Sequence, residues 1–188
     1  MRTRSSPELI DITTPSITLA AIDHEMARAI LIGRPPGGAI WADGYPTEGS
    51  LACATSVMVA IDESRSDPFG AFCIVRNDDR TTIGDTLFHG PPDDRGIVDI
   101  GYGLVPSARG HGYATIAVVA MITWAFGHAG VCRVTANTTD DNVGSVALMQ
   151  RAGMKVSHGP GGLMRGVALR DHWTPPMANG PDEPSASH

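Results

Sequence analysis

Cysteine is scarce in this 188-residue chain, which has only Cys53, Cys73 and Cys132. The three are isolated and odd in number, and none stands in a C-x-x-C pair of the kind that binds zinc or carries redox chemistry. Scattered cysteines are also unlike the disulfide framework of a small secreted domain. We therefore expect buried free thiols in a reducing, cytoplasmic compartment, and neither a cysteine nucleophile nor a cysteine ligand.

Long apolar runs are also absent. The longest uncharged stretch, Ala114–Phe126, is too short to span a bilayer. The first residues, Met1–Pro7, lead into Glu8 and Asp11 and not into the apolar centre of a signal peptide. We expect a soluble protein without a membrane partner.

Positive charge is in short supply, with 14 lysines and arginines against 20 acidic residues and a net charge of −6. A nucleic-acid-binding protein usually concentrates positive charge, so we expect no nucleic-acid partner. An acidic surface favours a cationic acceptor such as an amine. Hydrophobic residues make up 42 %, enough for the core of one domain. No repeat or linker divides the chain, and we expect one domain over 1–171 and a disordered proline-rich tail over 172–188.

Apolar patterning and turn residues predict an α/β (α+β) protein in the order β-α-α-β-β-β-α-β-α-β-β. Strands are expected over 17–22, 69–75, 82–88, 96–105, 131–136, 154–156 and 163–169. Helices are expected over 23–32, 48–61, 114–126 and 142–152.

Most of the functional information lies in the segment Gly103–Thr115, which reads GLVPSARGHGYAT. A strand ends at Pro106, a glycine-bearing turn follows, and an apolar helix comes next. This order presents free N–H groups and the positive end of a helix to a phosphate. Gly110 and Gly112 have no Cβ, so the oxygens of a ligand can approach the main chain. The segment predicts a bound phosphate compound.

The spacing in this loop does not fit two common phosphate-binding patterns. The Walker loop needs Gly-Lys-Ser/Thr, which is missing, and the dinucleotide pattern G-x-G-x-x-G fails because Gly110-His-Gly-Tyr-Ala-Thr115 ends in threonine. The pattern R-x-x-G-x-A does fit, as Arg109–Ala114. This resembles the acyl-coenzyme A loop of the GNAT superfamily of N-acetyltransferases, and Asp99–Pro106 looks most like its RimJ/RimL-type branch.

A second motif strengthens the resemblance. In the family, N-x-x-S-x-x-L precedes a Gly-Phe pair, and here Asn142, Ser145 and Leu148 are followed by Gly153 and Met154. Methionine thus replaces the usual phenylalanine. Asn142 and Ser145 are three residues apart, so on a helix they share a face and can point toward one ligand.

The resemblance implies a GNAT fold, with a central mixed, mostly antiparallel β-sheet flanked by helices on both faces. It implies acetyl-CoA as co-substrate and no metal. The backbone of Leu104 and Val105 would pair with the pantetheine arm like an added strand, Asn142 would cap a helix or reach the pantetheine amides, and Ser145 would lie near the thioester sulfur. The pyrophosphate would bind to Arg109, Gly110, His111, Gly112, Tyr113 and Ala114.

Two residues are catalytic candidates. Asp99 would accept a proton from the amine, directly or through a water, because an amine near neutral pH is protonated and must lose a proton before it attacks. Glutamate is usual at this position in the branch, and the shorter aspartate favours the water route; an exposed edge-strand carboxylate is the alternative. Met149 stands where many relatives have a general-acid tyrosine, which leaves Ser145, Tyr113 or water to protonate the thiolate.

These observations predict an acetyl-CoA-dependent N-acetyltransferase that transfers the acetyl group directly in a ternary complex. Two alternatives remain open: a catalytically silent acyl-CoA-binding or regulatory module of the same fold, and a nucleotide-binding protein of another fold. The acceptor could be a protein N-terminus, an aminoglycoside, a polyamine or an amino-acid derivative. Family members are often dimers, so a homodimer is possible.

Overall fold

The computed structural model describes residues 10–62 and 68–176. The expectations about Met1–Pro7 and about the tail beyond residue 176 lie outside these ranges. The strands are β1 Ile12–Thr13, β2 Ile17–Ala21, β3 Ile40–Trp41, β4 Ala71–Arg76, β5 Thr81–Phe88, β6 Ile97–Leu104, β7 Arg133–Thr139, β8 Lys155–His158 and β9 Leu163–Leu169. The helices are α1 His24–Ile32, α2 Glu48–Asp62, α3 Tyr113–Phe126 and α4 Val143–Arg151.

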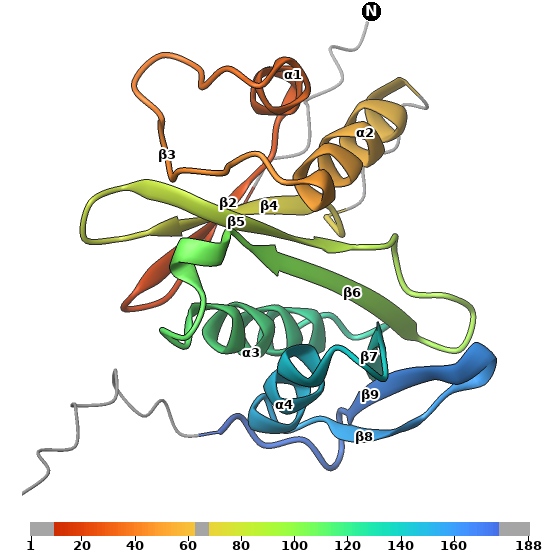
Figure 1. Cartoon of the computed structure of the whole chain (residues 1–188). Coiled ribbons are helices and arrows are strands. Elements are labelled where there is room, and N and C mark those ends of the chain that lie inside the picture. The colour runs from red at the N-terminus through yellow and green to blue at the C-terminus, as the bar shows by residue number, and fades with distance from the viewer. Residues whose placement is uncertain (1–9, 63–67, 177–188) are drawn as a thin grey trace, which may run out of the picture.

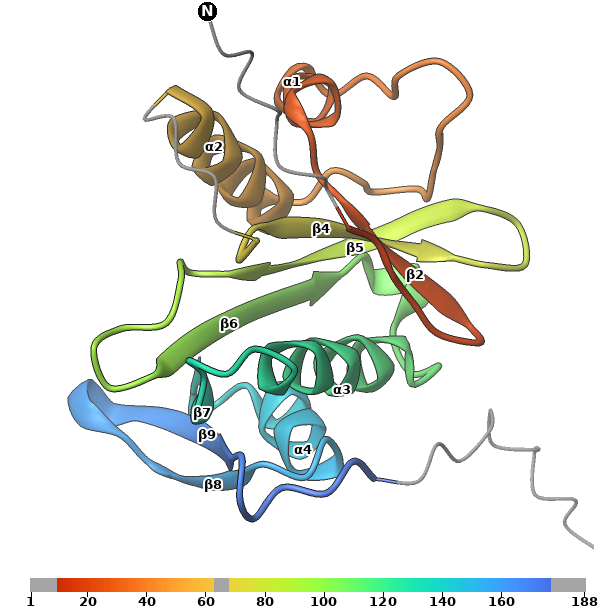
Figure 2. The same ribbon diagram turned by 180° about the vertical axis from the view of Figure 1, so that it is seen from behind.

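All these strands belong to one sheet, in the order β1-β2-β4-β5-β6-β7-β9-β8, with β3 added alongside β5. Every pairing is antiparallel except β6 with β7 and β3 with β5. Helices α1 and α2 cover one face of the sheet, and α3 and α4 cover the other (Figures 1 and 2). The predicted fold is therefore confirmed. The two-residue strands β1 and β3 were not predicted, because two residues carry no readable alternation.

Local sequence signals explain where the first two helices begin and end. Asp23 caps α1 by accepting a hydrogen bond from the N–H of Met26, and Gly33 ends the helix in the left-handed conformation. At the start of α2, Thr47 and Ser50 exchange bonds: each backbone N–H donates to the hydroxyl of the other residue. This reciprocal cap fixes the first turn of α2 against the sheet.

Helix α3 is apolar on all sides because it is enclosed between the sheet and α4. Val118, Met121 and Ile122 have no exposed surface. Near its end, Trp124 packs edge-on against Phe69 at 5.2 Å between ring centroids. Burial of such side chains contributes about 1.5–3 kcal/mol each, so α3 anchors the segment that precedes it.

The described residues continue past position 171, where we expected the domain to end. Trp173 donates from Nε1 to the carbonyl of Ala152 at the end of α4, at 3.0 Å, and its ring lies 5.7 Å from that of Phe126. The domain therefore includes at least Trp173. Within residues 10–62 and 68–176, no helix combines the length and apolar character needed to cross a membrane.

The expectation of three buried thiols is correct for two of the cysteines. Cys53 and Cys73 are buried, whereas Cys132 is exposed, and all three are free. Cys132 comes just before β7, at the surface, and its thiol donates to the carbonyl of Arg95 at 3.0 Å.

Candidate active site

The segment between β6 and α3 has the geometry of an anion-binding loop. Gly110 and Gly112 have φ angles of 80° and 78°, values that residues with a side chain rarely adopt. A Cβ built on either glycine would meet no atom within 4 Å, so the space beside them is open. Gly112 begins α3 without a side-chain cap. The first N–H groups of α3 are therefore available to an external acceptor such as a phosphate.

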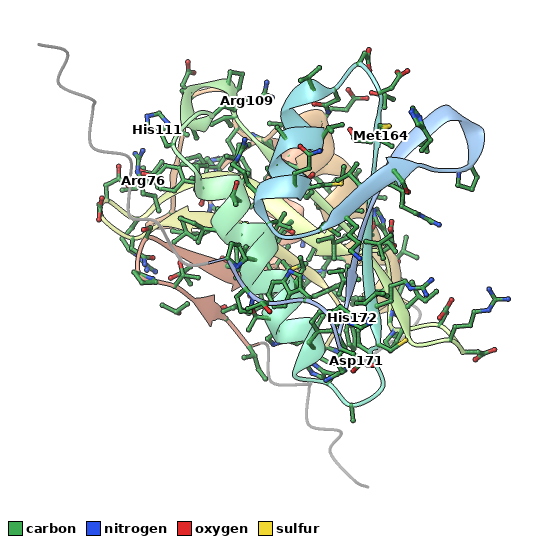
Figure 3. The ribbon with its side chains drawn as sticks, turned by 90° about the horizontal axis from the view of Figure 1, so that it is seen from below. Arg76, Arg109, His111, Met164, Asp171 and His172 are labelled. Carbon is green, nitrogen blue, oxygen red and sulfur yellow. The ribbon has the colours of Figure 1, made fainter. Side chains whose placement is uncertain are left out.

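Two arginines and a histidine lie in or near this loop. Arg109 is exposed, and its Nε donates to the carbonyl of Leu104 at 3.2 Å. The ring of His111 stacks on that of Tyr113, with centroids 5.9 Å apart. Figure 3 shows Arg109, His111 and Arg76 on the same side of the molecule, near the start of α3. The sequence motif did not identify Arg76 because it lies on β4, which the fold brings to this end of the sheet.

Strands β6 and β7 pair only over their first halves, from Ile97 with Arg133 to Ile100 with Ala136. Beyond that point no strand of the described residues 10–62 and 68–176 pairs with β6 on the β7 side. Backbone groups of a strand point alternately to its two neighbours. Asp99 and Val105 point toward β5, since the carbonyl of Asp99 accepts from the N–H of His89 and the N–H of Val105 donates to the carbonyl of Ile83.

By this alternation, the free edge of β6 consists of the backbone groups of Tyr102 and Leu104. The N–H of Val105 already donates to the carbonyl of Ile83. The pairing of Val105 with the pantetheine arm stays a prediction. Leu104 does lie on the free edge, although its carbonyl already accepts from Arg109. An extended ligand arm could add here as a strand.

The start of α4 faces this free edge of β6. Asn142 is the N-cap, and its Oδ1 accepts from the N–H of Ser145 at 3.1 Å. A contact between Asn142 and the pantetheine arm stays a prediction. The Ser145 hydroxyl lies 2.6 Å from the hydroxyl of Tyr102. Burial raises the pKa of Tyr102, and its bond with Ser145 acts in the opposite direction. Met149 has no exposed surface, so it cannot serve the site.

Asp99 lies on β6 with its side chain 34 % exposed. Its Oδ1 accepts from the Thr135 hydroxyl at 2.5 Å and from Nδ2 of Asn137 at 3.0 Å, both on β7. The other oxygen, Oδ2, lies 4.0 Å from Nε2 of His89, a distance that one water can bridge. The carboxylate is therefore fixed through one oxygen and free at the other. His89 was not identified from the sequence, because a lone histidine after a strand carries no motif.

Gly101 and Gly103 lie on the same face of β6 as Asp99, and only one of these two glycines borders open space. A Cβ on Gly101 would come within 2.7 Å of Leu87 and 3.1 Å of His89, so side chains from β5 occupy that space. A Cβ on Gly103 would meet nothing within 4 Å. The open space therefore lies above Gly103 alone.

A buried carboxylate, Asp85 on β5, lies directly opposite Gly103 in the register of the two strands. It is 4 % exposed. The Tyr45 hydroxyl donates to its Oδ1 at 2.6 Å, and the Ser50 hydroxyl donates to its Oδ2. Sequence reasoning missed Asp85, which reads as one polar residue within a strand; its burial depends on α2 and on the loop before α2.

Burial governs the ionisation of the groups around Asp85. It raises the pKa of Asp85 to about 6, while the bonds from Ser50 and Tyr45 act in the opposite direction. Burial also raises the pKa values of Cys53 and Cys73, each to about 12, and Asp85 adds to both shifts. These thiols are therefore neutral at physiological pH, as the sequence led us to expect, and are poor nucleophiles.

The described parts of the chain contain no group of three or more His, Cys, Asp or Glu side chains that could hold a metal ion. The arrangement instead offers an anion-binding helix start, a free strand edge, a fixed carboxylate and a tyrosine–serine pair. The helix start and the strand edge can hold an extended phosphate-bearing ligand. The carboxylate can accept one proton, and the hydroxyl pair can donate another.

Comparisons with known proteins agree with this geometry. The sequence profile of the acetyltransferase (GNAT) domain family matches residues 39–155. The chain is 31 % identical over 100 residues to the uncharacterized N-acetyltransferase YjdG of Bacillus subtilis (strain 168). That match covers 53 % of this chain and 60 % of the relative, which is less than two thirds of the relative's length.

Solved structures share the fold at low sequence identity. An acetyltransferase from Agrobacterium tumefaciens str. C58 is 19 % identical, with a TM-score of 0.62 over 89 % of this chain and 99 % of that one. The ribosomal-protein-S5-alanine acetyltransferase from Vibrio fischeri is 15 % identical, with a TM-score of 0.62 over 88 % and 100 %. RimL, a ribosomal L7/L12 alpha-N-protein acetyltransferase in complex with coenzyme A, is 15 % identical, with a TM-score of 0.60 over 85 % and 98 %.

Proposed function

The chain belongs to the GNAT acetyltransferase domain family, and on that premise we propose that it is an acetyl-CoA-dependent N-acetyltransferase that acts on a primary amine. The family is the one that the Arg109–Ala114 and Asn142–Ser145 motifs predicted, and the ribosomal-protein acetyltransferases of the same fold support the RimJ/RimL-type branch. The observation that carries the proposal is the separation of β6 from β7 beside an uncapped α3. A free strand edge that ends at an anion-binding loop suits a phosphate-bearing arm.

Coenzyme A would bind in two parts. Its pyrophosphate would accept hydrogen bonds from the backbone between Arg109 and Ala114, with Arg109 and His111 adding donors and the α3 dipole adding favourable charge. Its pantetheine arm would pair with the edge of β6 at Tyr102 and Leu104. This places the thioester near the start of α4, beside Ser145.

Acetyl-CoA, when bound, supplies a thioester: the nitrogen of a neutral amine attacks its carbonyl carbon, the amide bond forms, the C–S bond breaks, and the sulfur leaves as thiolate. The protein must remove a proton from the amine and supply one to the sulfur. We assign the first task to Asp99 through a chain of waters, because Thr135 and Asn137 hold its Oδ1 and leave Oδ2 free. We assign the second to the hydroxyl pair of Tyr102 and Ser145.

The ribosomal-protein acetyltransferases of the same fold act on proteins, which supports a protein amine as the acceptor. The RimJ/RimL-type resemblance also favours a peptide N-terminus. The acetyl group would pass directly to that amine in the ternary complex. A cysteine acyl-enzyme is disfavoured, because burial keeps Cys53 and Cys73 protonated.

The test is release of free thiol from acetyl-CoA by the purified chain. Pools of N-terminal peptides, aminoglycosides, polyamines and amino acids serve as acceptors, each beside a reaction without acceptor. Release above that control with one pool supports the proposal and names the acceptor class. Silence with every pool, together with calorimetric binding of acetyl-CoA, favours the silent acyl-CoA-binding module. If no pool gives thiol release and acetyl-CoA does not bind, the proposal that the Arg109–Ala114 loop binds coenzyme A is wrong.

A further inference from the structure

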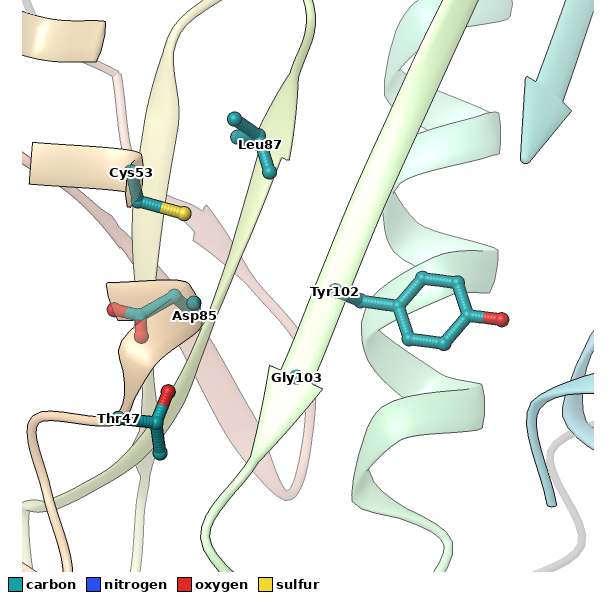
Figure 4. A pocket seen from close by; sticks show the side chains of 7 residues that line it. Thr47, Cys53, Asp85, Leu87, Tyr102 and Gly103 are labelled. Atoms are coloured by element: carbon teal, nitrogen blue, oxygen red, sulfur yellow. The ribbon is translucent and has the colours of Figure 1, made fainter. Parts of the chain in front are cut away.

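A cavity of about 90 Å³ lies between the start of α2 and the facing parts of β5 and β6. Its lining residues are Thr47, Gly49, Cys53, Asp85, Leu87, Tyr102 and Gly103. Figure 4 shows the side chains of Thr47, Cys53 and Asp85 on one side of β6, with the Tyr102 ring pointing to the other side. No lysine, arginine or histidine is among the lining residues. The cavity is therefore walled by neutral groups around one carboxylate.

The carboxylate of Asp85 has hydrogen-bond partners but lacks a counter-ion. Its partners are neutral groups: the hydroxyls of Tyr45 and Ser50 and the thiol of Cys73. Within the described ranges no basic side chain forms an ion pair with it. A carboxylate offers about four acceptor positions, so one remains. A buried carboxylate without a cation is costly, and the raised pKa of Asp85 reflects that cost.

The cavity adjoins the strand on which acetyl transfer would take place. Asp85 pairs with Gly103 across β5 and β6, so both face α2. Because Gly103 has no side chain and the space above it is open, an occupant can rest directly on the β6 backbone. The opposite edge of β6 is the one left free by β7. An occupant of the cavity would thus lie about one strand spacing, roughly 5 Å, from a thioester on that edge.

We propose that this cavity is the acceptor subsite and that it holds the ammonium group of a primary amine, with Asp85 as its counter-ion. The assignment rests on the proposed acetyltransferase function and narrows its substrate. One N–H group of the ammonium donates to the free acceptor position of Asp85, and the other two can point toward water and Thr47. The small volume and the apolar walls at Cys53 and Leu87 fit a small, uncharged substituent on the amine carbon. A bulky or charged substituent does not fit these walls.

The test uses L-alaninamide, a primary ammonium with a methyl substituent, and N-acetyl-L-alaninamide, which lacks the charge. Each is titrated calorimetrically into protein saturated with coenzyme A. We expect the first to bind and the second not to bind. Asp85→Asn should weaken binding of alaninamide by about tenfold or more, because it removes one partner of a buried charge pair. Coenzyme A affinity should stay within about twofold, because Asp85 contacts no part of the loop.

Asp62→Asn is the matched control, since it makes the same change at the exposed far end of α2, outside the lining of the cavity. It should keep the binding of alaninamide. Because a variant at Asp85 could unfold, Cys53→Leu provides a second test: it keeps the carboxylate and fills the cavity, and it should also abolish binding. Folding of each variant is checked by its thermal unfolding transition.

The outcomes separate this inference from the proposed function. Equal binding of alaninamide by the parent and by Asp85→Asn overturns the assignment of Asp85. Coenzyme A binding without any binding of alaninamide by the parent overturns the subsite and leaves the acetyltransferase proposal standing. Failure to bind coenzyme A overturns the proposed function itself.

Discussion

The hydroxyl of Tyr102 on β6 lies 2.6 Å from the hydroxyl of Ser145 on α4. The contact joins β6 to α4, the helix that follows β7. It lies beyond the point where β6 and β7 stop pairing. Ser145 belongs to a motif, whereas Tyr102 was only part of a strand in the sequence. We propose that this pair supplies the proton that many relatives take from a tyrosine on the helix, at a position that Met149 occupies here.

Tyr102→Phe should lower kcat by about tenfold to a hundredfold while leaving the affinity for acetyl-CoA nearly unchanged. The ring still packs, but the hydroxyl that would protonate the sulfur is lost. The effect should be moderate, because a thiol with a pKa of about 8.5 is already a tolerable leaving group. Steady-state kinetics and calorimetry measure the two quantities. If Tyr113→Phe lowers kcat and Tyr102→Phe does not, the proton donor is assigned to the wrong tyrosine.

Asp99→Asn should lower turnover by about a hundredfold or more without weakening acetyl-CoA. Asparagine keeps the shape and the hydrogen bonds from Thr135 and Asn137 at one oxygen, but it cannot accept a proton. The loss should shrink as pH rises, since more of the amine is then already neutral. A pH–rate profile that falls by the same factor at every pH would contradict the proposed role as base.

Asp85 should make the protein less stable as pH rises from about 4 to about 6. Burial raises its pKa from 3.8 to about 6 in the folded state, so between these values the folded state binds more protons than the unfolded state. The linkage relation then requires stability to fall with rising pH. Above pH 6 the full cost is about 3 kcal/mol at most, since one pKa unit corresponds to about 1.4 kcal/mol.

Asp85→Asn should remove this pH dependence. The unfolding free energy of the variant minus that of the parent should increase by about 1–3 kcal/mol as the pH rises from 4.5 to 7. Urea unfolding of both proteins across that range measures the difference, and using the difference cancels the contributions of the other carboxylates. A constant difference at all pH values would mean that Asp85 has an ordinary pKa in the folded protein.

The sequence predicted best those features that depend on local pattern. The long apolar run at Ala114–Phe126 has one physical solution, a buried helix, and Asp23 and Gly33 mark the ends of α1 by their own chemistry. The glycine spacing from Arg109 to Ala114 predicted a turn that leads into a helix, and the structure has this backbone, with positive φ at Gly110 and Gly112 before an uncapped α3.

Features that depend on packing between distant elements could not be read in this way. The use of Val105 by β5 follows from strand register, which one strand alone does not specify. The same holds for Asp85, whose partners Tyr45 and Ser50 come from a loop and a helix some 35 to 40 residues earlier. Cys132 was expected to be buried like the other thiols, yet its place just before β7 leaves it at the surface.

Alanine at Gly84 and alanine at Gly103 should affect different properties: the first the stability of the protein, the second its KM for the amine. A Cβ on Gly84 would lie 2.1 Å from the carbonyl oxygen of Gly103 and 2.9 Å from the Cα of Leu104, both backbone atoms that cannot move aside cheaply. Gly84→Ala must therefore separate β5 from β6, and it should lower the unfolding free energy by about 1–3 kcal/mol or more.

Gly103→Ala places its methyl group in open space, so stability should change by no more than about 0.5 kcal/mol. That methyl group would instead occupy the opening above β6, between Asp85 and the free edge, and should raise the KM for the amine. Thermal unfolding and acceptor kinetics on both variants separate the two effects. A Gly103→Ala protein with unchanged acceptor kinetics would mean that the amine does not approach the thioester over this part of β6.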